Sequence, residues 1–166
     1  MKNSRRVKKT IFIVDDQPVY ANILKSEIEN RDNAVHVFSS GEACMASMDK
    51  NPDIVVLDFE LDDGSKKNMN GIEVLMKIKE NFPEVEVIML SGHDDVNIAT
   101  TSIKFGANDY VVKNESALIN VQNKIRNIGR RMEVLAELKE VNTLKVKIAG
   151  AVVFGITVAT IMSVFS

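Results

Sequence analysis

The sequence contains a single cysteine, Cys44, and this scarcity excludes a framework of disulfide bonds. No activating histidine adjoins Cys44, so we expect a buried packing residue rather than a nucleophile. A large excess of charge is also missing, because 21 basic and 23 acidic residues leave a formal net charge of -2. Neither a helix-turn-helix context nor a zinc-ligand spacing follows residue 130. The sequence therefore gives no reason to expect nucleic-acid binding.

We also expect no export signal in the first residues. The basic segment 1–9 is followed by only five uncharged residues before Asp15, and this run is too short for the apolar core of a signal peptide. The length of 166 residues predicts one domain of ordinary size with an appendage. A reducing cytosol fits the apolar surroundings of Cys44.

Short apolar runs alternate with helical patterns along most of the chain. We expect strands near 10–15, 34–38, 53–58, 85–90 and 109–112, and helices near 17–30, 40–49, 71–81, 95–105 and from 116 onward. The run Ile54 to Leu57 is continuously apolar, which is typical of a strand covered on both faces. Five strand–helix units of this kind predict a doubly wound α/β sheet.

Polar residues follow four of these runs directly. They are the pair Asp15-Asp16, then Asp58, Ser91 and Lys113. In doubly wound sheets, ligands bind outside the carboxyl ends of the strands, so these side chains are expected to share one site. Each residue alone also has a simpler interpretation: the acidic pair as a helix cap, Asp58 and Ser91 as turn residues, and Lys113 as a solvated lysine.

Together these residue types suit phosphoryl transfer. Adjacent carboxylates favour a hard divalent cation such as Mg²⁺, and a carboxylate can also attack phosphorus to form an aspartyl phosphate. An ammonium and a hydroxyl group help to neutralise the charge on the phosphoryl oxygens. No histidine–serine or histidine–cysteine pair suited to acyl transfer is visible in the sequence.

The order of acidic pair, aspartate, hydroxyl, aromatic and lysine resembles that of a response-regulator receiver domain. The separations also match, with 42 residues from Asp16 to Asp58, 22 from Ser91 to Lys113 and three from Tyr110 to Lys113. The resemblance covers roughly residues 8–130. It implies a flavodoxin-like, doubly wound sheet of five parallel strands in the order 2-1-3-4-5. The apolar spacing after residue 116 adds an extended C-terminal helix to this fold.

The resemblance also implies a role for each residue of the site. Asp58 would accept a phosphoryl group from a histidine kinase or a phosphotransfer protein. Mg²⁺ would be held by Asp16, Asp58 and the backbone carbonyl of Glu60, with Asp15 acting through water. Such a chain would not be an enzyme, apart from slow hydrolysis of its own acyl phosphate.

Lys113 and four further residues would contact the phosphoryl group or act on it. Lys113 would pair with it, Ser91 would form a hydrogen bond to it, and Tyr110 would follow by changing rotamer. Glu60 and His93 would tune its lifetime. Tyr110 alone can also be interpreted as a core residue, and His93 as an exposed loop histidine that binds no metal.

Two features depart from the family pattern. Asn114 follows Lys113, where the family usually has proline in a cis peptide, so this peptide is either trans or a costly non-proline cis bond. The segment 59–70 is about five residues longer than the same segment usually is in the family that the chain resembles. Its polar residues predict a solvated insertion. The alternative is that the insertion shapes access to Asp58 or determines which kinase acts on the chain.

The C-terminal part has a different pattern. Apolar residues spaced by three and four form a stripe that predicts either a helix packed on its own domain or a dimeric stem: Val121, Ile125, Ile128, Met132 and Leu135. The last nineteen residues, 148–166, carry no charge and follow several basic residues. As a helix they would span about 28 Å, close to a bilayer core of roughly 30 Å.

We therefore expect a receiver domain over 1–130, a helical stem over 131–147 and a transmembrane helix over 148–166, with the domain in the cytoplasm. A hydrophobic helix buried in a soluble oligomer is the alternative for the last segment. A repeat of small residues within it suggests a possible homodimer.

Two functional hypotheses follow. The first is a phosphoacceptor of a two-component phosphorelay that signals to a downstream protein partner. The second is a scaffold at the membrane that binds its partners independently of phosphorylation. An aspartate-nucleophile phosphohydrolase fits less well, because its nucleophile would follow the first strand.

Overall fold

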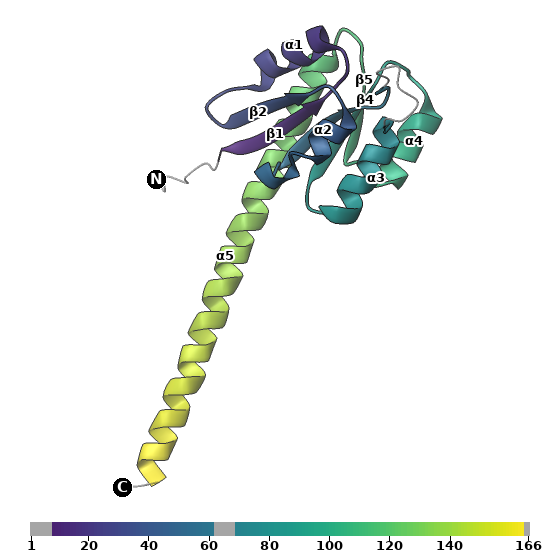
Figure 1. The fold of residues 1–166 in the computed structure, drawn as a ribbon. Coiled ribbons are helices and arrows are strands. Elements are labelled where there is room, and N and C mark those ends of the chain that lie inside the picture. The colour runs from purple at the N-terminus through teal and green to yellow at the C-terminus, as the bar shows by residue number, and fades with distance from the viewer. Residues whose placement is uncertain (1–7, 62–68, 165–166) are drawn as a thin grey trace. The chain divides into compact units, whose positions relative to one another are not determined.

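The computed structural model describes residues 8–61 and 69–164, with side chains up to Ala151. Five parallel strands form one sheet in the order β2-β1-β3-β4-β5 (Figure 1). Their bounds are β1 Lys9–Val14, β2 Asn33–Phe38, β3 Ile54–Asp58, β4 Glu86–Ser91 and β5 Asp109–Val112. The predicted doubly wound, flavodoxin-like sheet with order 2-1-3-4-5 is therefore confirmed.

The central strands β1, β3 and β4 are largely buried, because both of their faces carry apolar side chains. Phe12, Val55 and Val87 are register partners on β1, β3 and β4, and all three belong to one core cluster with Cys44 and the inner side of α3 (Gly71–Asn81). The residues next along each strand are also buried, but they point to the opposite face. Cys44 is fully buried, as predicted, and burial raises the pKa of its thiol to about 12.

The helices begin with residues that favour a helix N-terminus, namely proline in the first turn or polar side chains that cap the free backbone N–H groups. α1 (Pro18–Ile28) has proline in its first turn, where no backbone N–H is needed. The α2 helix (Gly41–Met45) is capped by Ser40, and a short 3₁₀ turn, η1 (Met48–Lys50), follows it. Asn70 and Glu73 form a capping box at the start of α3, and Asp95 caps α4 (Val96–Lys104).

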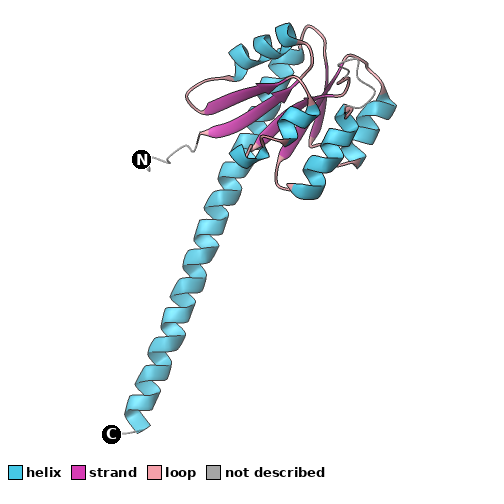
Figure 2. Cartoon of the chain, in the orientation of Figure 1, coloured by secondary structure: helices cyan, strands magenta, loops and turns pink. Residues whose placement is uncertain are grey.

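The two faces of the sheet are covered by different helices. Figure 2 shows α2 and α3 together on one face, where they flank the core cluster. On the other face, α1 is joined to the first turns of α5 (Ala117–Val164), because Gln122 Nε2 donates a hydrogen bond to the carbonyl oxygen of Glu27 at 3.0 Å. Val121 and Ile125 of α5 are buried there.

The chain divides into two compact units, residues 1–126 and 127–166. In the second unit, α5 continues as a single helix to Val164, and its described side chains include many exposed charges. The assignment of 131–147 as a stem and its dimerisation remain predictions.

The predicted membrane anchor is wrong. No helix within the described residues is both long and apolar enough to cross a membrane. The prediction judged residues 148–166 from their own composition, whereas the structure makes residues 148–164 the end of a 48-residue helix with charged turns before them. Side chains from residue 152 onward lie outside the described part.

Candidate functional site

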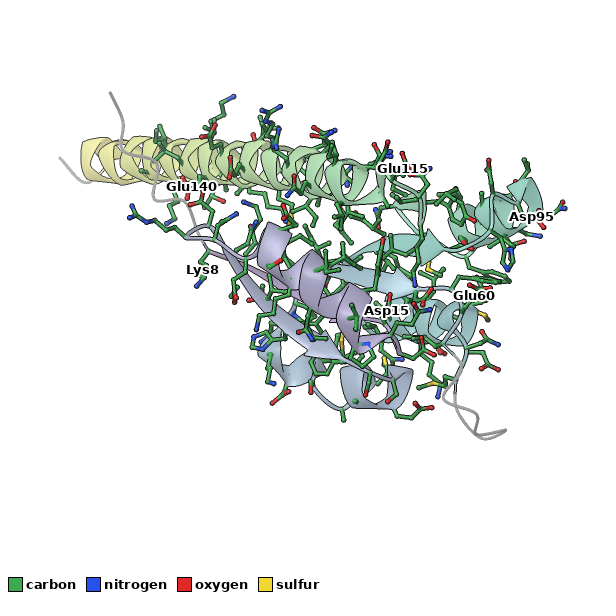
Figure 3. All side chains as sticks on the ribbon, turned by 90° about the horizontal axis from the view of Figure 1, so that it is seen from above. Lys8, Asp15, Glu60, Asp95, Glu115 and Glu140 are labelled. Atoms are coloured by element: carbon green, nitrogen blue, oxygen red, sulfur yellow. The ribbon has the colours of Figure 1, made fainter. Side chains whose placement is uncertain are left out.

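The polar residues predicted to share a site all come from one edge of the sheet. Asp15 directly follows β1, whereas Asp58 and Ser91 are the last residues of β3 and β4. Parallel pairing of Asp58 with Leu90 and of Ser91 with Val112 brings these strand ends level. In Figure 3, Lys8 and Asp15 mark opposite ends of β1, and Glu60 lies toward the same end as Asp15.

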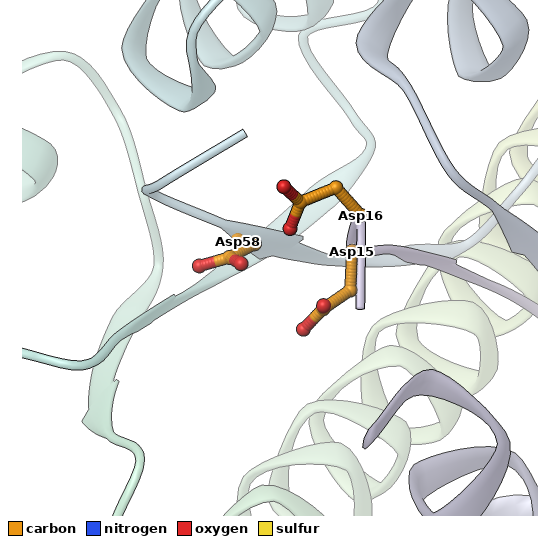
Figure 4. A group of neighbouring side chains, drawn as sticks. All are labelled: Asp15, Asp16 and Asp58. Carbon is orange, nitrogen blue, oxygen red and sulfur yellow. The ribbon is translucent and has the colours of Figure 1, made fainter. Parts of the chain in front are cut away.

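Three carboxylates meet at this edge. One oxygen from each of Asp15, Asp16 and Asp58 lies within 4.8 Å of the others, and Figure 4 shows the three side chains side by side. Asp15 and Asp58 are buried, and Asp16 is partly exposed. Oxygens bound to Mg²⁺ at about 2.1 Å stand roughly 3–4 Å apart, so a small contraction would fit the cluster to that ion. The donor set is thus compatible with Mg²⁺.

Lys113 lies between two of these carboxylates. Its Nζ atom is 2.6 Å from Asp58 Oδ2 and 2.8 Å from Asp15 Oδ2. Burial opposes the charge on Lys113, but the hydrogen bonds to Asp15 and Asp58 outweigh that cost and raise the pKa of the amine. The ammonium is therefore fixed beside Asp58.

Asp58 is held by more than its ion pair. Burial raises the pKa of Asp58 above the ordinary aspartate value, although Lys113 acts in the opposite direction. The backbone N–H of Glu60 donates to Asp58 Oδ1 at 3.2 Å. Gly71 lies directly against the strand end, because a Cβ atom there would come within 2.2 Å of the Asp58 carbonyl oxygen. Only glycine fits this approach without a shift of the backbone.

The loop after Ser91 connects the site to Tyr110. Ser91 is buried, and its Oγ atom accepts a hydrogen bond from the backbone N–H of His93 at 3.1 Å. The hydroxyl group of Tyr110 donates to the carbonyl oxygen of His93 at 2.5 Å. Ser91 and Tyr110 therefore both form hydrogen bonds to the backbone of His93.

The side chains of His93 and Glu60 contact each other at the edge of the site. The Nε2 atom of His93 lies 2.8 Å from Glu60 Oε1, and the histidine side chain is 65% exposed. The pair joins the loop after β3 to the loop after β4. The sequence singled out both residues but gave no sign of this contact.

The peptide between Lys113 and Asn114 is trans, since the described residues contain no cis peptide bond. Asn114 instead shapes the turn into α5, where its Oδ1 atom accepts a hydrogen bond from the backbone N–H of Ser116 at 2.9 Å. The backbone N–H of Lys113 donates to the Ser91 carbonyl oxygen at 2.7 Å. These bonds hold the backbone of Lys113 without a proline.

Two further contacts at the site were not predicted from the sequence. The ring of Tyr20, on α1, lies 4.9 Å from Lys113 Nζ. Glu42 Oε1 accepts a hydrogen bond from the backbone N–H of Met69 at 2.8 Å, and this bond is the main cause of the lowered pKa of Glu42. It ties the end of the predicted insertion to α2, while residues 62–68 of that insertion lie outside the described part.

The family of the chain follows from comparison with known proteins. The family profile of the response regulator receiver domain matches residues 11–125. The chain therefore belongs to the receiver-domain family of two-component response regulators. The resemblance drawn from the strand-end residues is thus confirmed.

Curated relatives agree with this assignment. The nitrogen assimilation regulatory protein NtrX of Azorhizobium caulinodans is 31% identical over 136 residues, which cover 81% of this chain and 28% of that protein. The transcriptional regulatory protein TrcR of Mycobacterium tuberculosis is 30% identical over 122 residues, or 73% of this chain and 45% of that protein. The chain spans less than half the length of these two relatives.

Solved structures show the same fold. The receiver domain of NtrX from Brucella abortus has a TM-score of 0.61 at 29% identity, covering 69% of this chain and 95% of that one. A BeF3-activated receiver domain of DrrB has a TM-score of 0.65 at 25% identity, covering 74% and 97% respectively.

Proposed function

We propose that this chain accepts a phosphoryl group on Asp58 from a histidine kinase or a phosphotransfer protein. The observation that carries the proposal is the Lys113 ammonium 2.6 Å from the Asp58 carboxylate, within a cluster of three aspartates. In the transfer, an oxygen of Asp58 bonds to phosphorus while the bond from phosphorus to the donor histidine nitrogen breaks. The products are an aspartyl phosphate and a free imidazole.

The acidic cluster is the proposed Mg²⁺ site. Asp16, Asp58 and the backbone carbonyl of Glu60 would supply oxygen ligands, and Asp15 would act through a bound water. The ion would neutralise charge on the phosphoryl oxygens when bound. The ordered position of Asp15 supports this role, since its Oδ1 atom accepts a hydrogen bond from the backbone N–H of Gln17 at 2.9 Å.

Lys113 and Ser91 would bind the phosphoryl group once it is attached. The ammonium already lies beside Asp58, so a small movement transfers its hydrogen bond to a phosphoryl oxygen. Ser91 Oγ is an acceptor from His93, which leaves its own hydroxyl hydrogen available as a donor. A shift of Ser91 toward the phosphoryl group would draw the His93 segment with it.

Tyr110 would carry this movement to the surface. Its hydroxyl group donates a hydrogen bond to the His93 carbonyl oxygen. Displacement of that carbonyl would break this hydrogen bond and allow the Tyr110 ring to change rotamer. The output would then be altered contact with a downstream protein partner.

The test is incubation of the purified chain with acetyl phosphate and Mg²⁺, followed by intact mass measurement. We expect a mass increase of one phosphoryl group that disappears in Asp58→Asn and when EDTA removes the metal. Asp94→Asn is the control, because Asp94 is exposed on a neighbouring loop. A folded wild-type chain that gains no mass would instead support a scaffold that acts independently of phosphorylation.

A further inference from the structure

Tyr20 lies in the first turn of α1 and contacts the site through Lys113. The start of α1 places it there: Asp15 turns the chain by accepting from the Gln17 backbone, and the helix begins one residue later at Pro18. The Tyr20 ring then lies 4.9 Å from Lys113 Nζ, measured to the ring centroid. This distance is within the range of about 6 Å in which a cation is attracted to an aromatic face.

The contact completes the surroundings of the Lys113 ammonium. Asp15 and Asp58 accept its two short hydrogen bonds, and the Tyr20 ring provides an electron-rich surface beside them. The Lys113 side chain is only 12% exposed, so little water competes for its charge. A lysine has a flexible four-carbon stem, and contacts on several sides are needed to fix its ammonium in one place.

The ring of Tyr20, rather than its hydroxyl group, makes this contact. The hydroxyl oxygen is buried and has no hydrogen-bond partner among the residues that the structure describes. A buried hydroxyl group without a partner stabilises neither the fold nor the lysine. Phenylalanine at this position should therefore preserve the contact, whereas an aliphatic side chain should remove it.

We propose that Tyr20 is a positioning residue for phosphoryl acceptance, whose ring holds Lys113 beside Asp58. The proposal rests on the proposed function of Asp58. Without the ring, the ammonium would sample positions away from the strand end and would neutralise the incoming phosphoryl group less often.

The kinetic test compares Tyr20→Leu with Tyr20→Phe at saturating Mg²⁺ and measures the rate of phosphorylation by acetyl phosphate. We expect Tyr20→Leu to lower the rate by about 5- to 30-fold, as loss of a cation–π contact implies, and Tyr20→Phe to remain within about twofold of the wild type. In a Lys113→Met background, Tyr20→Leu should have no further effect, because the ring then has no ammonium to hold.

Three kinetic results would overturn the proposal. They are a wild-type rate in Tyr20→Leu, an equal loss in Tyr20→Phe, and an unchanged effect of Tyr20→Leu in the Lys113→Met background. The last result would show that the ring acts on the fold in general and not through Lys113.

A second measurement needs no phosphorylation. In NMR spectra, the ε-methylene protons of Lys113 should be shifted upfield by the ring in the wild type and in Tyr20→Phe, and should return toward ordinary lysine values in Tyr20→Leu. If Tyr20→Leu does not fold, the wild type and Tyr20→Phe still decide the point, since ordinary shifts in both would overturn the contact. Upfield shifts in a chain that accepts no phosphoryl group would overturn the function of Asp58 and not the contact. A chain that is phosphorylated but shows ordinary shifts would overturn the contact alone.

Discussion

The Lys113 ammonium nitrogen lies 2.6 Å from Asp58 Oδ2, although 55 residues separate the two in the chain. The Asp58 side chain is fully buried and the Lys113 side chain nearly so. Lys113 also pairs with Asp15 at 2.8 Å, so loss of the lysine would leave two buried carboxylates without a cation, whereas loss of the Asp58 charge leaves the lysine paired with Asp15. Changes to this pair should therefore affect both the free energy of unfolding and the proposed phosphoryl acceptance.

Replacing Lys113 by methionine should be costly. Asp15 and Asp58 would remain buried together without their cation, so we expect a loss of about 3 kcal/mol in the free energy of unfolding, measured by urea denaturation without metal. The matched control is Lys124→Met, which breaks a more exposed ion pair with Asp109 at 2.6 Å. That variant should lose less than about 1 kcal/mol. Equal losses in the two variants would contradict the importance of burial.

Replacing Asp58 by asparagine should stabilise the metal-free chain by about 1 kcal/mol near neutral pH. The raised pKa means that burial disfavours the charged carboxylate, and an amide keeps an oxygen for Lys113 without that charge. The folded chain retains the Asp58 proton longer than the unfolded chain, so wild-type stability falls as pH rises above the ordinary aspartate pKa.

The advantage of Asp58→Asn should therefore shrink as the pH falls from neutral toward the ordinary aspartate pKa, because the folded chain takes up the Asp58 proton before the unfolded chain does. Denaturation curves of the two proteins across this range give the measurement. A difference that grows toward acid pH would show that Asp58 prefers its charged form in the fold.

Magnesium should raise the melting temperature of the wild type. An ion that binds the folded state alone stabilises it by about 2.7 kcal/mol at a concentration one hundred times its dissociation constant. Asp16→Asn should weaken this response, because Asp16 contributes one of the three converging carboxylates. The exposed Asp94→Asn serves as the control. A shift that persists in full in Asp16→Asn would place the ion elsewhere.

Gly71→Ala should destabilise the chain by at least about 2 kcal/mol, because its Cβ atom would meet the backbone at the end of β3. Gly92→Ala provides the comparison. A Cβ atom there would meet only the flexible end of Glu60 at 3.0 Å, so its cost should be much smaller. Thermal unfolding of both variants measures the difference, and similar melting temperatures would contradict the close approach of Gly71 to Asp58.

The sheet and its edge were predictable because apolar runs mark the strands and parallel strands align their carboxyl ends. Asp15, Asp58 and Ser91 occupy that edge because each stands directly at the end of its run. The Tyr20–Lys113 contact was not predictable in the same way. It depends on the direction in which α1 presents its side chains, over a separation of 93 residues that no local pattern reports.

Two other features required the structure. The contact between His93 and Glu60 depends on the paths of two separate loops, and the bonds made by Asn114 depend on how the turn enters α5. The membrane prediction is contradicted because no helix in the described part of the chain is long and apolar enough to span a bilayer, and residues 148–164 end a helix that begins at Ala117.

Site mapping of the phosphoryl group tests the central claim most directly. The chain is treated with acetyl phosphate and Mg²⁺, reduced with borohydride to convert an aspartyl phosphate to homoserine, digested and analysed by mass spectrometry. We predict homoserine at position 58 and its absence when Mg²⁺ is withheld. Homoserine at another aspartate, or none in a chain that remains folded, would contradict the assignment of Asp58 as the phosphoacceptor.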